Sequence, residues 1–195
     1  MHILIVYGTK EGQTAKIAER IAQLIRNRGL QVTTYPVKDM HVDFATDAFD
    51  AAIVGGSIHM GRYPTHLREF VTRHRDWLNK IPSALFTVCM AIQSQNADER
   101  EEARNYGERF TETTRWRPTL VETFAGAVKY TQYDFITRFI MKMITKREGG
   151  STDTHFDHEY TDWDAVARFT NRFLEEIKVA ASGARREPES EQGFR

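Results

Sequence analysis

Hydroxyl side chains and a glycine lie together near the start of the chain, between an apolar run and a helical pattern. The stretch comprises Thr9, Lys10, Glu11, Gly12, Gln13 and Thr14. Backbone N–H groups at a helix N-terminus converge on an anion, and the helix dipole favours negative charge there. The hydroxyls of Thr9 and Thr14 can donate hydrogen bonds, and Gly12 lets the backbone approach closely. Local chemistry alone supports two interpretations equally: a phosphate cradle or an ordinary strand-to-helix turn.

The other short motifs fit established chemistry less well. The stretch at Thr9–Thr14 is neither a Walker A sequence nor GxGxxG, so ATP and NAD are poor candidates. Gly55–His59 has His59 where a nucleophile elbow needs glycine, which disfavours a serine hydrolase. His155–Glu159 is expected on a loop without further ligands at metal-site spacing, so no metal is expected. Cys89 is expected to act as a small buried hydrophobe rather than a redox thiol.

Apolar runs alternate with helical periodicity, which indicates the elements that position these residues. Strands are predicted at Ile3–Tyr7, Leu30–Tyr35, Ala51–Val54, Ala84–Met90 and Leu120–Val128. Helices are predicted at Thr14–Arg28, from Pro64, at Asp98–Thr113, and from a capping box at Thr161–Asp164. The alternation predicts a parallel sheet with helices on both faces. Ligands of such sheets bind beyond the carboxyl ends of the strands, so the loops after strands one, three, four and five are the candidates.

Length and charge favour a single globular domain. The chain has 195 residues, with 27 basic and 27 acidic side chains and no formal net charge. Zero net charge gives no basic footprint for nucleic acid, so no nucleic-acid partner is expected. A single cysteine excludes a disulfide within the chain and a zinc site of four thiolates. The sequence shows neither a signal peptide nor an apolar run long enough to cross a bilayer, so a cytoplasmic location is expected.

The segment Ile5–Ala18 (IVYGTKEGQTAKIA) resembles the flavodoxin signature. In that family this loop holds the phosphate of FMN, so the resemblance implies FMN as cofactor. It implies an α/β, flavodoxin-like three-layer sandwich over residues 1–178, with a five-stranded parallel sheet in the order 2-1-3-4-5. Residues 129–160 are then an insertion after strand five. Residues 179–195, polar toward their end and containing Pro and Gly, are expected to be a disordered tail.

Further segments narrow the resemblance to the flavodoxin-like, quinone-dependent protoporphyrinogen IX oxidases of bacterial haem synthesis. These segments are Gly55–Tyr63, Trp116–Pro118, Ala125–Ala127, Gly149–Thr154 and Tyr160–Trp163. The resemblance implies oxidation of protoporphyrinogen IX to protoporphyrin IX, with menaquinone or ubiquinone as electron acceptor. Because the flavin would carry the redox chemistry, no catalytic side chain is expected.

Fold and resemblance together place the loops after strands three and four on the two sides of the flavin ring. The expected flavin contacts are Ser57, Ile58, His59, Met60, Gly61 and Tyr63 on one side, and Cys89, Met90, Ala91 and Ile92 on the other. Flavodoxins often stack aromatic side chains on both ring faces, but Cys89–Asn96 contains no aromatic residue. One flavin face is therefore open to a planar tetrapyrrole, or else Met90 and Ile92 cover it.

The segment Gln132–Arg147 within the insertion has the pattern of a basic amphipathic helix. Its apolar face would carry Tyr133, Ile136, Ile140, Met143 and Ile144, and its basic row Arg138, Lys142 and Lys146. Such a helix suits a membrane surface, a site within its own domain, or a homo-oligomer contact. A quinone-reducing enzyme needs access to lipid, which favours peripheral attachment to the inner face of the cell membrane.

Two alternatives of different kinds stay open. A quinone reductase fed by NAD(P)H could use the same fold, since flavodoxin-like reductases often lack a nicotinamide fingerprint. A non-enzymatic electron carrier is the second. Small flavodoxin carriers are commonly strongly acidic, however, and this chain has no net charge.

Overall fold

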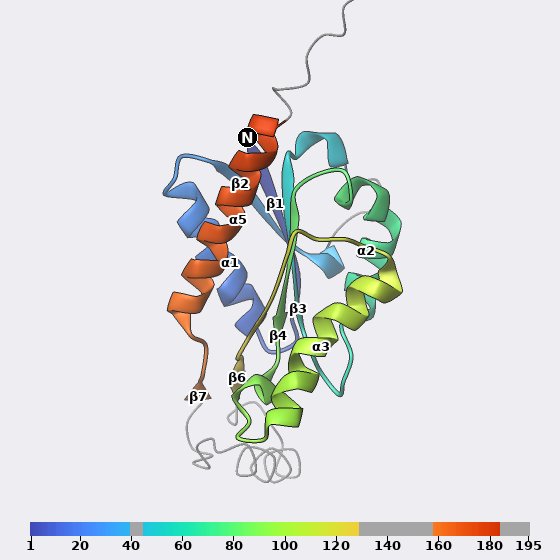
Figure 1. Ribbon diagram of the computed structural model, residues 1–195, viewed down its shortest axis with the longest axis vertical. Helices are drawn as coiled ribbons and strands as arrows, with labels where there is room; N and C mark the ends of the chain where they lie inside the picture. Colours follow the sequence, from blue (N-terminus) through green and yellow to red (C-terminus); the bar gives the residue numbers. More distant parts are fainter. Residues whose placement is uncertain (40–44, 129–157, 184–195) are drawn as a thin grey trace, which may run out of the picture.

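The computed structural model describes residues 1–39, 45–128 and 158–183, shown as ribbons in Figure 1. The strands are β1 (His2–Gly8), β2 (Gln31–Pro36), β3 (Ala51–Ser57), β4 (Ser83–Val88), β5 (Leu120–Phe124), β6 (Ala127–Val128) and β7 (His158–Glu159). The helices are α1 (Gln13–Arg26), α2 (Thr65–Leu78), α3 (Ala97–Thr114) and α5 (Trp163–Gly183). Short 3-10 turns lie at Val37–Asp39, Thr46–Ala48 and Met90–Gln93.

The main sheet has five strands in the order β2-β1-β3-β4-β5, and all neighbouring pairs are parallel. The predicted strand order is therefore confirmed. The fifth predicted strand, Leu120–Val128, is too long. It ends at Phe124, and Ala127–Val128 forms a separate antiparallel pair with His158–Glu159. The change of partner occurs at Ala125-Gly126, where the N–H of Tyr160 donates to the Gly126 carbonyl at 3.0 Å.

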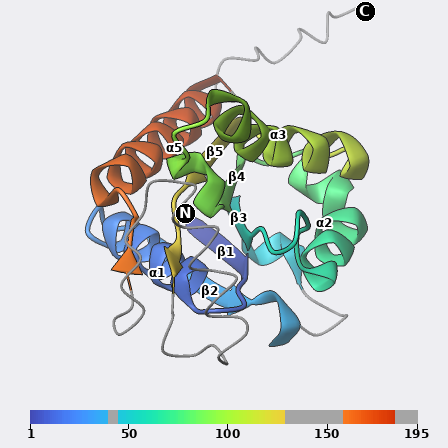
Figure 2. The same cartoon turned by 90° about the horizontal axis from the view of Figure 1, so that it is seen from below.

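Alternating side chains of β1 divide the interior into two cores. Ile3 and Ile5 pack with residues of α1 and α5, whereas Leu4 and Val6 pack with residues of α2 and α3. Figure 2 shows the same three layers from below, with α1 and α5 on one side of the strands and α2 and α3 on the other. All four β1 side chains are fully buried, as expected for a strand covered on both faces.

One glycine before the candidate site is required by close packing. A Cβ atom on Gly55 would lie 2.0 Å from Cζ of Phe86, its register partner on β4. The Phe86 ring therefore occupies the space above the Gly55 backbone, and a side chain at residue 55 would displace it. This contact fixes the end of β3, from which the second candidate loop starts.

The last helix begins differently from the sequence prediction. The Oδ1 of Asp162 accepts hydrogen bonds from the N–H groups of Asp164 and Ala165, both at 2.9 Å. Asp162 is therefore the capping side chain, and the predicted capping box at Thr161 is wrong, because the Thr161 hydroxyl instead donates to the Ala125 carbonyl. Helix α5 continues to Gly183, so residues 179–183, expected in the tail, are helical. The rest of the tail and residues 129–157 of the insertion lie outside the described residues.

Candidate functional site

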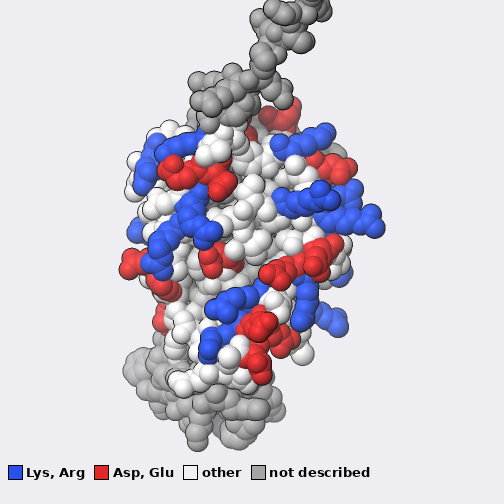
Figure 3. All heavy atoms as spheres, viewed as in Figure 1, with Lys and Arg blue, Asp and Glu red and all other residues white. Residues whose placement is uncertain are grey.

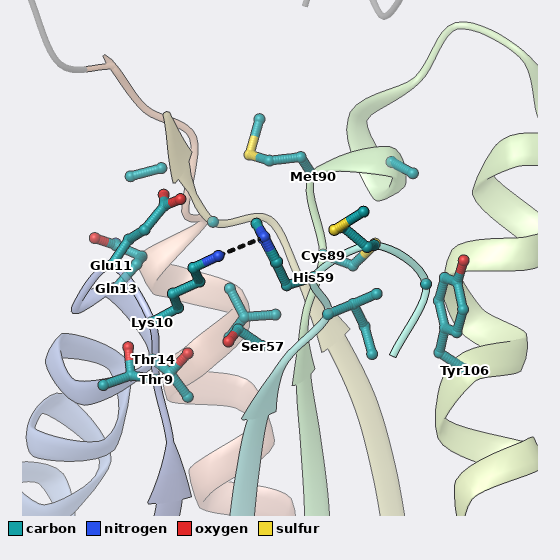
Figure 4. A pocket seen from close by; sticks show the side chains of 17 residues that line it. Thr9, Lys10, Glu11, Gln13, Thr14, Ser57, His59, Cys89, Met90 and Tyr106 are labelled. Atoms are coloured by element: carbon teal, nitrogen blue, oxygen red, sulfur yellow. Dashed lines mark hydrogen bonds between the residues drawn. The ribbon is translucent and has the colours of Figure 1, made fainter. Parts of the chain in front are cut away.

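A cavity of about 430 Å³ opens beyond the carboxyl ends of β1, β3 and β4, as expected for a parallel sheet. Figure 4 shows its lining side chains, which come from the three following loops, from the segment after β5 and from helix α3. The lining residues are Thr9, Lys10, Glu11, Gln13, Thr14, Ser57, Ile58, His59, Met60, Gly61, Val88, Cys89, Met90, Ala91, Tyr106, Gly126 and Ala127.

One end of the cavity is formed by the N-terminus of α1. Gly12 precedes the helix with φ of 90°, in the left-handed region that favours glycine, and its N–H donates to the Thr9 hydroxyl at 2.9 Å. Within the described part of the chain, no side chain caps this helix end. The first-turn N–H groups, which have no partner within a helix, are therefore available to a ligand, and the helix dipole adds positive potential.

Three buried side-chain atoms at this end have no hydrogen-bond partner among the described residues. They are Oε1 of Gln13, Oγ1 of Thr14 and Oγ of Ser57, and all three residues line the cavity. Buried polar atoms in folded proteins are normally paired, so unpaired ones call for an explanation. Two hydroxyl donors beside free backbone N–H groups suit a phosphate, and the Gln13 acceptor suits a neighbouring hydroxyl. FMN carries both groups on one chain, so these residues fit it.

The cavity lining combines apolar side chains with polar side chains from the first two loops. Ile58, Val88 and Met90 are among the apolar lining residues. At the mouth, the Lys10 ammonium lies 2.6 Å from Nε2 of His59 and joins the first loop to the second (Figure 4). An apolar slot with polar ends is the usual environment of a flat cofactor.

The structure brings together all but three of the predicted site residues. Gly12 contributes backbone at the helix start, and Ile92 lies in the turn Met90–Gln93, but neither lines the cavity. Tyr63 also does not: its hydroxyl lies 2.6 Å from Oγ1 of Thr87, and its ring packs on Phe110 at 4.3 Å. Burial raises the pKa of the Tyr63 hydroxyl far above its ordinary value. The structure therefore assigns Tyr63 to the core between β4 and α3.

Sequence reasoning missed Val88, Tyr106, Gly126 and Ala127 in the cavity lining. Tyr106 is the one that changes the chemistry, since it supplies an aromatic side chain opposite the first loop (Figure 4). Partial burial and the carboxylate of Glu102 raise its pKa. Its position depends on how α3 packs, and no sequence signal at Tyr106 itself indicates it.

A hydrogen-bonded network ties the phosphate end to the last helix. Nε2 of Gln13 donates to the Thr161 hydroxyl at 2.9 Å. The Glu159 carboxylate accepts from Lys16 at 3.1 Å and from the Trp163 indole at 2.9 Å. Burial acts to raise the pKa of Glu159, but hydrogen bonds from Lys16, Gln13 and Trp163 outweigh it and hold the pKa below its ordinary value.

The sequence predicted no metal site at His155–Glu159 and a buried, non-redox role for Cys89. Among residues 1–39, 45–128 and 158–183, no cluster of three or more His, Cys, Asp or Glu side chains could hold a metal. Residues 155–157 of the candidate ligand run lie outside the described residues, and His158–Glu159 form β7. Cys89 is buried at the end of β4, where it also lines the cavity.

Solved structures with this fold include flavodoxins. A flavodoxin from the domain Archaea aligns with a TM-score of 0.55 and 16% identity, covering 91% of this chain and 99% of its own. Flavodoxin 1 of Bacillus cereus aligns with a TM-score of 0.52 and 14% identity, covering 90% and 98%. At these identities the likeness shows the fold alone.

Sequence relatives narrow the family. The flavodoxin domain family model matches residues 4–155. A protein of Escherichia coli strain K12 named protoporphyrinogen IX dehydrogenase (quinone) is 33% identical over 169 residues, covering 87% of this chain and 92% of its own. A protein of the same name from Leishmania major is 33% identical over 172 residues, covering 87% and 73%. The chain thus belongs to the flavodoxin domain family, in the group whose curated members carry the name protoporphyrinogen IX dehydrogenase (quinone).

Proposed function

We propose that this chain is an FMN-dependent oxidoreductase that oxidises protoporphyrinogen IX to protoporphyrin IX and passes the electrons to menaquinone or ubiquinone. The observation that carries the proposal is the phosphate end of the cavity. The buried hydroxyls of Thr14 and Ser57 lie there beside the N-terminus of α1, and neither the hydroxyls nor the helix end has a side-chain partner among the residues that the structure describes. The substrate and acceptor come from the shared name of the relatives in Escherichia coli and Leishmania major.

Polar groups of this chain would bind the cofactor phosphate, and apolar side chains would exclude water from the flavin ring. The N–H groups of the first turn of α1 and the hydroxyls of Thr9 and Thr14 would hold the FMN phosphate. Apolar side chains such as Ile58 and Met90 would hold the flavin ring away from water. When bound, FMN would supply the two-electron redox chemistry that links oxidation of the porphyrinogen to reduction of a quinone. The Lys10 ammonium, held by His59, adds positive charge at the mouth.

A non-enzymatic electron carrier and a quinone reductase fed by NAD(P)H are both less well supported. Figure 3 shows basic and acidic side chains interspersed over the visible face, unlike the acidic surface that a small electron carrier commonly presents. No curated relative reported above is named as a reductase fed by a nicotinamide cofactor. Porphyrinogen oxidation also places the chain in haem biosynthesis, which is part of this proposal.

A direct test compares electron donors under one set of conditions. Purified, FMN-loaded protein is assayed without oxygen for reduction of a menaquinone analogue, with protoporphyrinogen IX or with NADH as donor. The proposal expects quinone reduction with protoporphyrinogen and formation of fluorescent porphyrin. Quinone reduction with NADH alone would instead establish the reductase.

Attachment to the membrane surface through Gln132–Arg147 is also part of the proposal. Its support is the sequence pattern, since the segment lies outside the described residues. In the described part of the chain, no helix has the length and apolar character needed to cross a bilayer. Each basic residue near an anionic surface contributes about 1 kcal/mol, and salt screens this contribution. Binding to anionic vesicles should therefore weaken with salt, and a wild-type protein that stays unbound at low salt would contradict the attachment.

A further inference from the structure

Lys10 and His59, from two different loops, both line the cavity, and Arg62 is paired with His59 across a tight turn. Lys10 lies on the first loop, His59 and Arg62 lie on the second, and all three are exposed. The Lys10 ammonium lies 2.6 Å from Nε2 of His59 (Figure 4). An ammonium group can only donate, so Nε2 of His59 is the acceptor in this contact. The remaining Lys10 N–H groups stay available to a ligand.

A tight turn sets the position of Arg62 relative to His59. The N–H of His59 donates to the Arg62 carbonyl at 3.0 Å, and the N–H of Arg62 donates to the His59 carbonyl at 3.2 Å. Residues directly opposite in an antiparallel pair carry their side chains on one face. Arg62 therefore projects from the same face of the turn as His59, which contacts Lys10.

The two central residues of this turn both have positive φ. The φ of Met60 is 49° and that of Gly61 is 74°. Methionine rarely adopts this conformation, and such strain in a structure is a reason to look for function. The Met60 side chain is 89% exposed, so it gains no packing in the described part of the chain. It instead provides apolar surface beside the three basic side chains.

The cavity is large enough for one flat cofactor but not for a second flat ligand beside it. A volume of about 430 Å³ lies toward the lower end of the range for a single small-molecule site. A second flat molecule would therefore meet the chain mainly at the mouth, where Lys10, His59, Met60 and Tyr106 are among the lining residues. Arg62 adjoins them through its pairing with His59. Glu11 is the only acidic residue among the described lining residues. The rim therefore suits a ligand with an apolar body and acidic substituents.

We propose that Lys10, His59 and Arg62 form a carboxylate-binding rim that selects tetrapyrroles with free acid side chains. The inference rests on the proposed function, since protoporphyrinogen IX has an apolar macrocycle with propionate groups. The Arg62 guanidinium offers two parallel donors to one carboxylate, and Lys10 offers a charged donor steadied by His59. Met60 and Tyr106 contact the macrocycle. The competing explanation is that these charges only neutralise the cofactor phosphate.

The test compares the acid with its ester in FMN-loaded protein. Binding of protoporphyrin IX and of its dimethyl ester is measured by porphyrin fluorescence in the same detergent. Loss of a hydrogen bond to a charged group corresponds to about tenfold or more in affinity. Lys10→Gln and Arg62→Gln should each lower the affinity for the acid about tenfold or more. Each should lower the affinity for the ester much less. The matched control is Arg68→Gln, because Arg68 is an exposed basic residue on α2 and should leave both affinities unchanged.

Kinetics and FMN titration separate the outcomes. With the reduced substrates, the rim variants should raise KM for the acid and leave kcat largely intact. Equal affinity of wild-type protein for acid and ester would overturn the proposal, as would an unchanged acid preference in both variants. If the variants lose affinity for FMN and keep the preference for the acid, the basic side chains serve the cofactor phosphate instead. If wild-type protein oxidises neither acid nor ester with a quinone, the proposed function itself fails.

Discussion

Replacing Thr14 by valine should stabilise the cofactor-free protein and weaken FMN binding at the same time. Thr14 is 1% exposed, and its buried Oγ1 has no hydrogen-bond partner in residues 1–39, 45–128 and 158–183. An unsatisfied buried hydroxyl costs about 1–3 kcal/mol, and valine has nearly the same shape. A gain of about 1 kcal/mol would raise the Tm of a domain this size by about 2–4 °C. Loss of a hydrogen bond to a phosphate should raise the Kd for FMN about tenfold or more.

The two effects are measured separately. Thermal unfolding of cofactor-free protein gives the Tm, and quenching of FMN fluorescence on titration gives the Kd. Thr170→Val is the matched control, since Thr170 is equally buried but its hydroxyl already donates to the Val166 carbonyl at 2.8 Å. The control should not raise the Tm and should leave the Kd for FMN unchanged. A lower Tm in cofactor-free Thr14→Val, or an unchanged Kd for FMN, would refute the assignment of this hydroxyl to the phosphate.

Three further outcomes are expected. Tyr63→Phe leaves the Thr87 hydroxyl buried without its partner, so the protein should lose about 1–3 kcal/mol of stability while FMN affinity is retained. The pKa of Glu159 is held below its ordinary value of 4.5 in the folded protein. Its stabilising contribution is therefore present above that value and is lost as the pH falls through the folded pKa, so Glu159→Gln should flatten the acid side of the Tm profile. Reversing the basic row of Gln132–Arg147 to glutamate should abolish binding to anionic vesicles at low salt.

Each outcome has its own check. Thr87→Val combined with Tyr63→Phe removes both partners, so the double variant should recover part of the lost stability. A double variant whose loss equals the sum of the two single losses would show that the hydroxyls do not interact. For Glu159→Gln, a Tm profile parallel to wild type at acid pH would contradict the role of the Lys16 ion pair. For vesicle binding, Ile140→Ser with Ile144→Ser should weaken attachment at every salt concentration, because apolar burial is not screened.

The position of the first loop was predictable because its signals are local. Local chemistry left a phosphate cradle and an ordinary turn equally open, and the family resemblance favoured the phosphate. The loop Thr9–Thr14 joins a buried strand directly to an amphipathic helix, so one backbone segment supplies the helix N-terminus and both threonine hydroxyls. Ser57 joins them from the end of β3. The strand order came from the family resemblance. The sequence alone supported only a parallel sheet, since several strand orders have the same alternation of elements.

The rest of the site depends on contacts between distant segments. Tyr63 was expected at the flavin because it follows the second loop, but the turn at Met60-Gly61 reverses the chain and its ring reaches Phe110 instead. Tyr106 reaches the cavity only because α3 packs beside the loop after β4. The predicted capping role of Thr161 was wrong for the same reason. Its hydroxyl donates to the carbonyl of the distant Ala125, and Asp162 caps the helix instead.

The proposed function requires electron transfer from a porphyrinogen to a flavin held beyond the carboxyl ends of this sheet. The most direct measurement mixes FMN-loaded protein with protoporphyrinogen IX without oxygen, first without a quinone and then with a menaquinone analogue. We expect the absorbance of oxidised flavin to fall as porphyrin fluorescence appears, and to return when the quinone is added. Flavin that stays oxidised in the presence of protoporphyrinogen IX, under conditions where a chemical reductant bleaches it, would contradict the proposed electron transfer.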